Sequence, residues 1–475
     1  MAYSILRPEI PALLLAGVCS VACSSSDKKA SANDDAGKTC PSAVTTDSKQ
    51  TDRTACKFEA GSKATESVDI TEAARKKLPI QHVIVVMKEN RSYDHLFGKL
   101  GDGYEGIPDS FSNKDNAGNV VKPFHLATTC VPSDPEHQWA EMHHQVNGGL
   151  MDGFVTNAQA TSSPPSPDGK FVMGYYEESD IPFYYFLAKT YALSDRHFAS
   201  VRSGTWADRD YLYDGTSDGV ENTASPPPSG FPGPDVKTIF DAMDAAGVSW
   251  GVYNDVFPLS LALGWAQDHP GVHPVKDLID GLSSGNLPSV AFVDGIPNFE
   301  DDHPAADLQV GEAWLKKIYD AAVAGPNWES TALFFTYDEG GGFADHVPPP
   351  EQDCVARPDN PKDQGFFELG VRIPLVAISP WARRHYVSHV QSEHTSITRF
   401  IELLFDLPAL TKRDANSDAL LDLFDFSCKN DAPIPEAPAA GTGGCTRGGP
   451  PADAGAPDAG RDGGAGVTGG NTTHD

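Results

Sequence analysis

The side chains best suited to chemistry in this chain stand directly after an apolar run. Glu89 and Asn90 follow residues 82–87, and four of the five positions from Val83 to Met87 are β-branched. Such a run predicts a buried strand of a parallel sheet, and open α/β sheets place their ligand sites at the carboxyl ends of strands. Carboxylate and amide oxygens are hard ligands that suit a divalent cation. The simpler alternative is a polar loop that caps the strand.

A hydroxyl group with nucleophilic potential stands at Thr205. Gly204 permits a tight turn before it, and the residues from Trp206 onward can start a helix. A hydroxyl at such a junction lies among free backbone N–H groups, with the positive end of the helix dipole behind it. This favours binding of a phosphoryl group, and it suits Thr205 as a nucleophile if a metal ion lowers the pKa of the hydroxyl. The alternative is an ordinary N-cap threonine.

Two adjacent carboxylates, Asp338 and Glu339, follow a second apolar run at residues 332–337. Adjacent carboxylates repel each other unless a cation or a proton lies between them. The glycines at 340–342 let the backbone approach a ligand closely. A solvated acidic turn is the alternative interpretation.

Histidines could complete such a site. His137 and His143 lie in one polar segment, and His303 follows a predicted strand at residues 288–293. Histidine can bind a phosphoryl oxygen or protonate a leaving group near neutral pH. A histidine taken alone is more often a surface or packing residue, so these side chains matter as a group.

The elements that must position these residues alternate along the chain. Strand patterns occupy residues 82–87, 249–253, 288–293, 332–337 and 373–378, and helix patterns occupy residues 236–246, 311–324 and 394–407. Strand and helix repeated in this order predict an α/β fold, with a mostly parallel central sheet and helices on both of its faces.

The charge balance of the chain limits its partners. Its 475 residues include 36 basic and 66 acidic side chains, which gives a formal net charge of −30. Such a surface repels nucleic acid, so binding by release of counterions is not expected. Net charge informs on partners and not on fold.

The N-terminus has the pattern of an export signal. Arg7 precedes an apolar segment at residues 10–22 that is too short for a stable membrane anchor. Residues 20–23 resemble a bacterial lipoprotein processing site, although Ser20 stands where such sites prefer leucine. We therefore expect an exported protein that associates with a membrane through a lipid on Cys23, with cleavage and secretion as the alternative.

Composition divides the chain into four parts. A signal peptide at 1–23 is followed by a polar linker at 24–78, a globular domain at 79–430 and a tail rich in Pro, Gly and Ala at 431–475. The linker and the tail have too few apolar residues to form a core, so we expect both to be disordered.

Six cysteines follow Cys19 and Cys23 in the sequence. An even number of cysteines in an exported chain predicts disulfides, but the sequence does not determine which residues pair. A local pair between Cys40 and Cys56 is compatible with their spacing. None of the six has the C-x-x-C spacing of a zinc site.

Together, these segments resemble a phosphoesterase family that contains bacterial phospholipases C and a group of acid phosphatases, within the alkaline phosphatase superfamily. The opening motif of the family matches residues 89–98, and its closing motif matches residues 338–349. The resemblance covers about residues 79–410. It implies an alkaline phosphatase-like fold and a metal-dependent hydrolase of phosphate esters.

The resemblance also implies roles for individual residues. It makes Thr205 the nucleophile, and it gives His137 and His303 contact with the phosphoryl or leaving group. One divalent ion, which could be Ca²⁺, Mg²⁺, Mn²⁺ or Zn²⁺, would be held by Glu89, Asn90, Thr205, Asp338 and Glu339. The expected contacts of the substrate are His143, Asp208 and His346.

One departure from the family pattern concerns the substrate. This chain has Ala207 and Asp208 where the family commonly has Pro-Asn. A carboxylate in place of an amide removes a hydrogen-bond donor and adds negative charge near an anionic substrate.

The predicted reaction is phospholipase C-like cleavage of a phosphodiester through a phosphothreonine. Two alternatives remain from the sequence: a phosphomonoesterase of the acid phosphatase type, and a surface-binding lipoprotein without catalysis. The sequence leaves the oligomeric state open.

Overall fold

The computed structural model describes residues 47–223, 236–256, 271–350, 354–429, 434–441 and 445. The predicted export signal and the predicted lipidation site at Cys23 lie outside these residues, as does Cys40. Among the helices that the structure describes, none has both the length and the apolar character needed to cross a bilayer.

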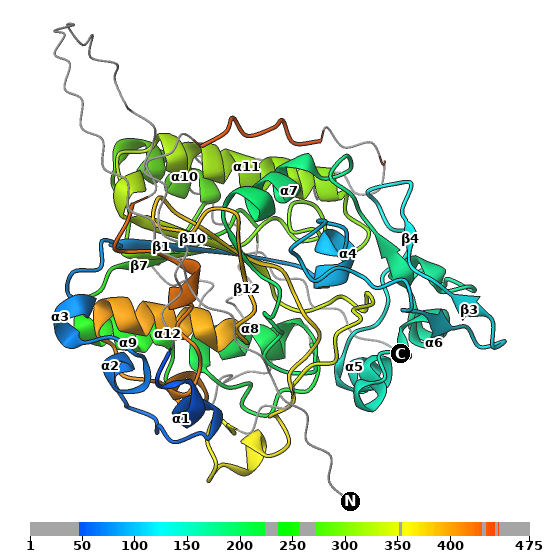
Figure 1. Cartoon of the computed structure of the whole chain (residues 1–475), viewed down its shortest axis with the longest axis horizontal. Coiled ribbons are helices and arrows are strands. Elements are labelled where there is room, and N and C mark those ends of the chain that lie inside the picture. Colours follow the sequence, from blue (N-terminus) through cyan, green and yellow to red (C-terminus); the bar gives the residue numbers. More distant parts are fainter. Residues whose placement is uncertain are drawn as a thin grey trace, which may run out of the picture. The chain divides into compact units, whose positions relative to one another are not determined.

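An eight-stranded sheet forms the centre of the domain (Figure 1), and its strand order is β12-β6-β11-β10-β1-β9-β7-β8. Neighbouring strands run parallel except β11, which is antiparallel to both of its neighbours. The expected mostly parallel sheet is therefore confirmed. The strands are β1 (His82–Lys88), β6 (Ala192–Ser194), β7 (Trp250–Tyr253), β8 (Val272–His273), β9 (Val290–Val293), β10 (Thr331–Tyr337), β11 (Leu375–Ile378) and β12 (Tyr386–Ser388).

Helices cover both faces of this sheet (Figure 1). One face carries α7 (Pro182–Thr190), α10 (Val275–Ser284) and α11 (Leu308–Ala324), and the other carries α8 (Thr205–Asp214), α9 (Ile239–Ala246) and α12 (His394–Phe405). Residues of the two central strands, β1 and β10, are almost all buried because helices lie above and below them. This explains why their sequences are continuous apolar runs without alternation.

Smaller elements follow β1 in the chain. They are α4 (Tyr93–Phe97), the pair β2 (Asn113–Lys114) and β3 (Val120–Val121), the pair β4 (Phe124–His125) and β5 (Gly174–Tyr175), α5 (Trp139–Val146) and α6 (Phe154–Thr161). Helix α13 (Lys412–Ala415) follows α12. Short 3₁₀ helices occupy Asn147–Gly149, Lys170–Met173, Trp328–Ser330, Pro361–Asp363 and Leu421–Leu423.

The described part of the expected linker is structured. It contains α1 (Gln50–Thr54), α2 (Ala64–Ser67) and α3 (Glu72–Arg75). Ala64 and Val68 form a small buried cluster with Leu403 and Ala419. Arg53 is buried and pairs with Asp418 at 2.7 Å. Polar composition concealed these contacts because ion pairs and only a few apolar side chains hold the segment against the domain.

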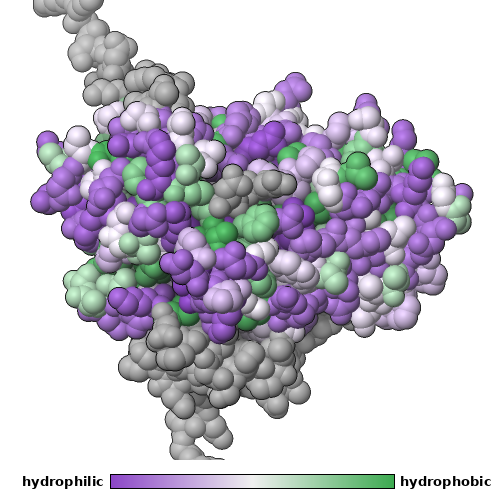
Figure 2. Space-filling model, turned by 90° about the horizontal axis from the view of Figure 1, so that it is seen from below, coloured by the Kyte–Doolittle hydropathy of each residue, from purple (hydrophilic) through white to green (hydrophobic). Residues whose placement is uncertain are grey.

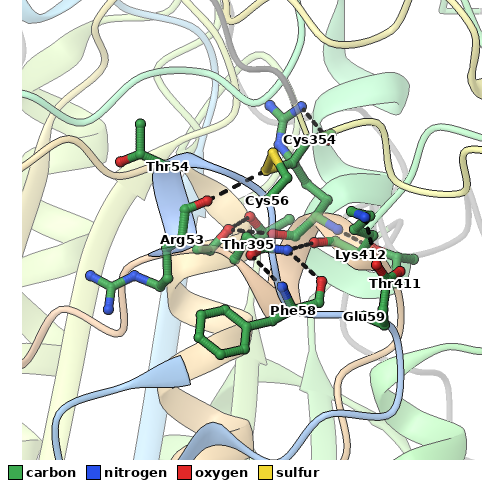
Figure 3. Close-up of a disulfide and its surroundings, with 12 residues drawn as sticks. Arg53, Thr54, Cys56, Phe58, Glu59, Cys354, Thr395, Thr411 and Lys412 are labelled. Atoms are coloured by element: carbon green, nitrogen blue, oxygen red, sulfur yellow. Dashed lines mark hydrogen bonds and ion pairs between the residues drawn. A yellow bond between two sulfur atoms is a disulfide. The ribbon is translucent and has the colours of Figure 1, made fainter. Parts of the chain in front are cut away.

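Two disulfides between described residues join distant parts of the chain. Cys56 bonds to Cys354, beside the contacts of Lys412 with Glu59 (Figure 3), and Cys130 bonds to Cys445. The expected pair between Cys40 and Cys56 is therefore wrong. Sequence proximity favoured it, whereas the fold brings Cys354 to Cys56 across 298 positions.

Part of the C-terminal tail also contacts the domain. Ile434, Ala437 and Ala440 pack against the core, and the Gly441 N–H donates to Glu312 Oε2 at 2.9 Å. With the disulfide at Cys445, these contacts hold residues 434–441 and 445 in place, although composition predicted disorder for the whole tail.

Hydrophilic residues predominate on the face shown in Figure 2, with smaller hydrophobic groups among them. Among the described residues, the exposed large hydrophobic side chains are Val120, Phe124, Leu150 and Val256. Single exposed apolar residues of this kind are normal on a protein surface.

Candidate active site

The ends of β1 and β10 place the first predicted ligands next to each other. These strands pair in parallel up to Lys88 and Tyr337, so Glu89 and Asp338 follow at the same edge of the sheet. The Asp338 N–H donates to the Lys88 carbonyl at 3.0 Å, which extends the ladder by one bond. The structure thus brings together two carboxylates that are separated by about half of the chain.

Arg209 joins these carboxylates to helix α8. Its guanidinium is fully buried, with Nη1 2.7 Å from Asp294 Oδ1, Nε 3.3 Å from Asp338 Oδ2 and Nη2 3.5 Å from Glu89 Oε1. Asp294 follows β9, so one arginine reaches the ends of three adjacent strands. Sequence reasoning missed this role. The available signal was the position of Arg209 four residues after Thr205, on the same face of a helix.

Thr205 is the first residue of α8 and is almost completely buried. Gly204 before it is the helix N-cap, in an extended conformation. A Cβ on Gly204 would lie 2.9 Å from Gln138 Oε1, so a side chain there would collide with the segment that carries His137. Because Thr205 stands four residues before Arg209, the two residues lie on the same side of α8, which meets the strand ends.

Asn90, Glu339 and His137 form the second half of the cluster. Asn90 Nδ2 donates to Glu339 Oε1 and lies 3.2 Å from His137 Nε2, which is itself 3.4 Å from Glu339 Oε1. The Gly341 N–H donates to Glu339 Oε2 at 2.6 Å. Gly341 has φ +62°, and a Cβ there would lie 2.1 Å from the Asn90 carbonyl oxygen, so the turn requires glycine.

Asp134 is an acidic neighbour of both catalytic histidine candidates. Its carboxylate lies 3.8 Å from His137 Nδ1 and 3.9 Å from His303 Nε2. His303 Nε2 is also 3.9 Å from Glu89 Oε2. The sequence analysis did not include Asp134, although an acidic residue three positions before His137 was a usable signal.

A buried polar network holds the loop that carries His303. Asp302 Oδ2 accepts from Lys88 Nζ at 2.8 Å, from Tyr184 at 2.8 Å and from Tyr337 at 2.6 Å. The Glu89 N–H donates to the Asp301 carbonyl at 2.8 Å. The loop is therefore fixed to the end of β1 through both main chain and side chain.

Burial dominates the electrostatics of the carboxylates. Burial, with Asp338 beside it, raises the pKa of Glu89 well above its ordinary value, and burial also raises the pKa of Asp338. Burial raises the pKa of Glu339 to about 8. For Glu89 and Glu339, the negative charges of neighbouring carboxylates add to the effect of burial.

The two histidines respond to this charge in opposite directions. Burial opposes protonation of His137, but the negative charges of Glu339 and Asp134 outweigh it and raise the pKa to about 9. For His303, burial outweighs the attraction of Asp134, and its pKa is lowered.

The donor set fits a hard divalent cation. Three buried carboxylates converge with one amide, and Asn90 Oδ1 is buried without a hydrogen-bond partner among the described residues. An amide oxygen left in this way normally costs about 1–3 kcal/mol, whereas a cation would use it as a ligand. Glu89, Asn90, Asp338 and Glu339 are thus able to hold such an ion, with ligand chemistry of the Ca²⁺, Mg²⁺ or Mn²⁺ type.

Three residues expected at the substrate have other partners. His143 Nε2 lies 3.0 Å from Glu368 Oε2, and its ring packs on Trp139. His346 Nδ1 lies 2.7 Å from Asp94 Oδ2, in a separate ion-pair network that includes Arg372.

Asp208 is fully buried, and its Oδ1 accepts from the Val201 N–H at 2.9 Å. It stabilises the turn that leads into α8. Burial, and after it the nearby charges of Glu339 and Asp338, raise the pKa of Asp208 well above its ordinary value. Asp208 therefore lies close to the predicted metal ligands, and its contact with substrate stays a prediction.

The mostly parallel sheet and this carboxylate-rich site fit an enzyme that hydrolyses phosphoric esters, and comparison with known sequences agrees. The sequence model of the Phosphoesterase family matches residues 80–408. The chain therefore belongs to the Phosphoesterase family, and the resemblance seen in its motifs is confirmed.

Relatives of known activity are phospholipases C. The chain is 33% identical over 382 residues to non-specific phospholipase C1 of Arabidopsis thaliana, a match that covers 71% of this chain and 69% of that protein. It is 31% identical over 414 residues to phospholipase C B of Mycobacterium tuberculosis, covering 73% and 78%. A crystal structure of a phosphonate monoester hydrolase of Agrobacterium radiobacter covers 69% of this chain and 74% of its own, with a TM-score of 0.33 and 11% identity. That structural likeness is too distant to carry an argument.

Proposed function

We propose that this protein is a metal-dependent phosphodiesterase of the phospholipase C type, which works through a phosphothreonine at Thr205. The observation that carries the proposal is the position of Thr205 at the start of α8, on the face where Arg209 contacts the carboxylates of Glu89 and Asp338. The names of the relatives support a phospholipid or similar diester as substrate.

Glu89, Asn90, Asp338 and Glu339 would hold the metal ion. When bound, a divalent cation supplies Lewis-acid polarisation of the phosphoryl group and lowers the pKa of a nearby hydroxyl. Arg209 keeps Glu89 and Asp338 in position through its two contacts, and Gly341 orients Glu339 through its N–H.

The first chemical step belongs to Thr205. Its oxygen attacks phosphorus, the new O–P bond forms, and the bond to the leaving alcohol breaks in line with it. The positive end of the α8 dipole at Thr205 stabilises the charge on the phosphoryl oxygens. In the second step, water attacks the phosphothreonine from the opposite side and releases Thr205.

The histidines move the protons. His303 Nδ1 lies 2.7 Å from the Pro304 carbonyl, whereas His303 Nε2 has its nearest acidic oxygens 3.9 Å away, beyond hydrogen-bond distance. The Thr205 hydroxyl loses its proton to solvent before the attack. His303, which is mostly neutral because its pKa is lowered, takes up a proton from solvent at Nε2 and passes it to the leaving alkoxide. The ring, neutral again, then accepts a proton from the attacking water. His137 Nε2, already held by Asn90 and Glu339, is placed to bind a phosphoryl oxygen.

A comparison of two substrates tests this proposal. A phosphorylcholine diester should be hydrolysed with a higher kcat/KM than a simple aryl monophosphate, and acid quenching should leave a phosphoryl adduct on the peptide that contains Thr205. Thr205→Ala should remove the adduct and lower kcat by a factor on the order of 10³ or more, while Thr205→Ser retains part of both. Turnover at the wild-type rate by Thr205→Ala would exclude the mechanism, and a preference for the monoester would assign the protein to the monoesterases.

We further propose that the protein is exported and held at a membrane by a lipid on Cys23. The support is the charge and apolar pattern of residues 1–23. Mass spectrometry of the mature N-terminus tests it, because a lipidated Cys23 and a cleaved, unmodified N-terminus differ in mass by the acyl groups.

A further inference from the structure

A pair of buried carboxylates outside the active site has no counter-charge. Asp210 and Asp214 lie on α8, one helical turn apart, and neither side chain is exposed to solvent. All four of their carboxylate oxygens lack a hydrogen-bond partner among the described residues. Buried carboxylates are normally paired or hydrogen-bonded, so two adjacent ones without partners require an explanation.

Their position on the helix increases the electrostatic cost. Residues at i and i+4 face the same side, so the two negative charges repel each other. Asp214 is the last residue of α8, where the helix dipole is negative and the final carbonyls lack intrahelical partners. Lysine or arginine is the favourable residue at the C-terminal end of a helix, whereas two aspartates there are unfavourable.

The neighbouring basic residues are already used by other acids. Arg357 pairs with Asp363 at 2.8 Å and with Asp218 at 2.5 Å, and Lys362 pairs with Asp218 at 2.8 Å. Within the described ranges, no basic nitrogen lies within 4.0 Å of either Asp210 or Asp214. These basic side chains are therefore engaged by other acids, and Asp210 and Asp214 would together carry a charge of −2 when ionised.

We propose that Asp210 and Asp214 bind a second divalent cation, which is structural and separate from the catalytic ion. The carboxylate oxygens, main-chain carbonyls at the end of α8 and water would supply an all-oxygen environment suited to Ca²⁺ or Mg²⁺. The ion neutralises the pair and the negative end of α8, and so it stabilises the C-terminal half of the helix that begins at Thr205. Burial raises the pKa of both carboxyls well above the ordinary value, and the charges of neighbouring carboxylates add to this effect.

This arrangement is distinct from the active site. Arg209 contacts Asp338 at the strand ends, whereas Asp210 and Asp214 follow Arg209 by one and five positions and therefore point in other directions around α8. The acidic neighbours of Asp214 are Asp218 and Asp241, and Asp241 belongs to α9. The second cation therefore lies toward α9 and does not contact the reacting groups.

The test uses the full chain in four forms: wild type, Asp338→Asn with Glu339→Gln, Asp210→Asn with Asp214→Asn, and all four substitutions together. Each is saturated with Ca²⁺ or Mg²⁺, passed through a desalting column and analysed for metal. We expect two ions per chain in the wild type, one in each double variant and none in the quadruple variant.

Thermal melting provides a second measurement that does not depend on activity. In the Asp338→Asn, Glu339→Gln background, adding Ca²⁺ should raise Tm, and neutralising Asp210 and Asp214 should remove this response. Asp244→Asn is the matched control. It removes an exposed carboxylate on α9, keeps an acceptor for Trp250 Nε1 and should leave both ion content and the Tm response unchanged.

Two results would show that Asp210 and Asp214 do not bind a cation. If the Asp210→Asn, Asp214→Asn variant keeps the wild-type ion content, or melts higher than wild type in both Ca²⁺ and EDTA, the two carboxyls are a buried protonated pair and the proposal is wrong. Because Asn has nearly the same shape as Asp, the variants test charge and not packing. If the Asp338→Asn, Glu339→Gln variant does not fold, the ion content of the wild type is compared directly with that of Asp210→Asn, Asp214→Asn. A loss of one ion per chain in that comparison supports the proposal by itself.

Discussion

Arg209 Nε lies 3.3 Å from Asp338 Oδ2, and this contact links the helix that begins at Thr205 to the strand end that carries two predicted metal ligands. The two residues are 129 positions apart in the chain, and both are fully buried. A nucleophile at a helix N-terminus and carboxylates at a strand end must keep a fixed separation for catalysis. This buried ion pair sets that separation.

Replacing Arg209 by methionine should destabilise the protein strongly. The substitution leaves Glu89, Asp294 and Asp338 buried without their shared cation, and breaking a buried pair typically costs about 3–5 kcal/mol. Urea unfolding in EDTA would measure the loss. Added divalent cation should recover part of it by neutralising the carboxylates.

Arg209→Lys provides the control for charge. Lysine keeps the positive charge but lacks the planar fork that contacts three carboxylates at once, so we expect an intermediate stability. Equal stability of Arg209→Met and wild type in EDTA would show that these contacts do not hold the helix.

Removal of the paired carboxylates should remove the catalytic ion. Asp338→Asn with Glu339→Gln keeps the size of both side chains but removes two negative charges from the site. Elemental analysis after desalting should show one bound ion fewer per chain, with hydrolysis reduced to background. Glu368→Gln changes a carboxylate that contacts His143 and should leave ion content unchanged. Retention of the full ion content by the double variant would contradict the ligand assignment.

The metal-free protein should lose stability as pH rises. The folded-state pKa of Glu339 is raised from 4.5 to about 8, and that of His137 from 6.5 to about 9. A raised folded-state pKa means that the protonated group favours folding. The contribution of Glu339 is therefore full below pH 4.5 and lost as pH rises through 8, and that of His137 is full below pH 6.5 and lost through 9. Melting curves in EDTA between pH 6 and 9.5 should show a falling Tm.

Cation affinity should change in the opposite direction over the same range. Protons and the ion compete for Glu339, so we expect the Kd for the catalytic ion to decrease by up to about tenfold for each unit of pH increase below 8. Calorimetric titrations in two buffers of different ionisation enthalpy would count the protons released. An affinity that does not change between pH 6 and 8 would show that Glu339 is ionised before the ion binds.

The disulfide between Cys56 and Cys354 should contribute substantially to stability. It joins residues 298 positions apart and holds the N-terminal segment against the domain. Removing a native disulfide typically costs about 2–5 kcal/mol. Cys56→Ser with Cys354→Ser should therefore lower Tm in the absence of reductant, whereas dithiothreitol should lower the Tm of the wild type and have less effect on the variant. Identical melting of the two proteins without reductant would mean that the ion pairs of Arg53 alone hold the segment.

The sequence predicted the central part of the fold well because that part depends on local pattern. The apolar runs at 82–87 and 332–337 became β1 and β10, and a third run at 373–378 became β11 at Leu375–Ile378. The pattern did not reveal that β11 runs antiparallel, because strand direction depends on the connections and not on the apolar run itself. The helix expected at 311–324 begins earlier, at Leu308, where Asp307 caps it.

Local sequence also determined which residues carry chemistry in this protein: Glu89 and Asn90 after one strand, Asp338 and Glu339 after another, and Thr205 behind a glycine. Tertiary structure alone decided what surrounds them. Arg209, Asp134 and Asp294 enter the site from three different segments, and the local pattern of each segment does not show which distant side chains will meet. Cys56 reached Cys354 for the same reason. Residues close in sequence form patterns from which strands and helices can be predicted. Residues that meet only in the folded protein are determined by packing, burial and charge balance between distant segments.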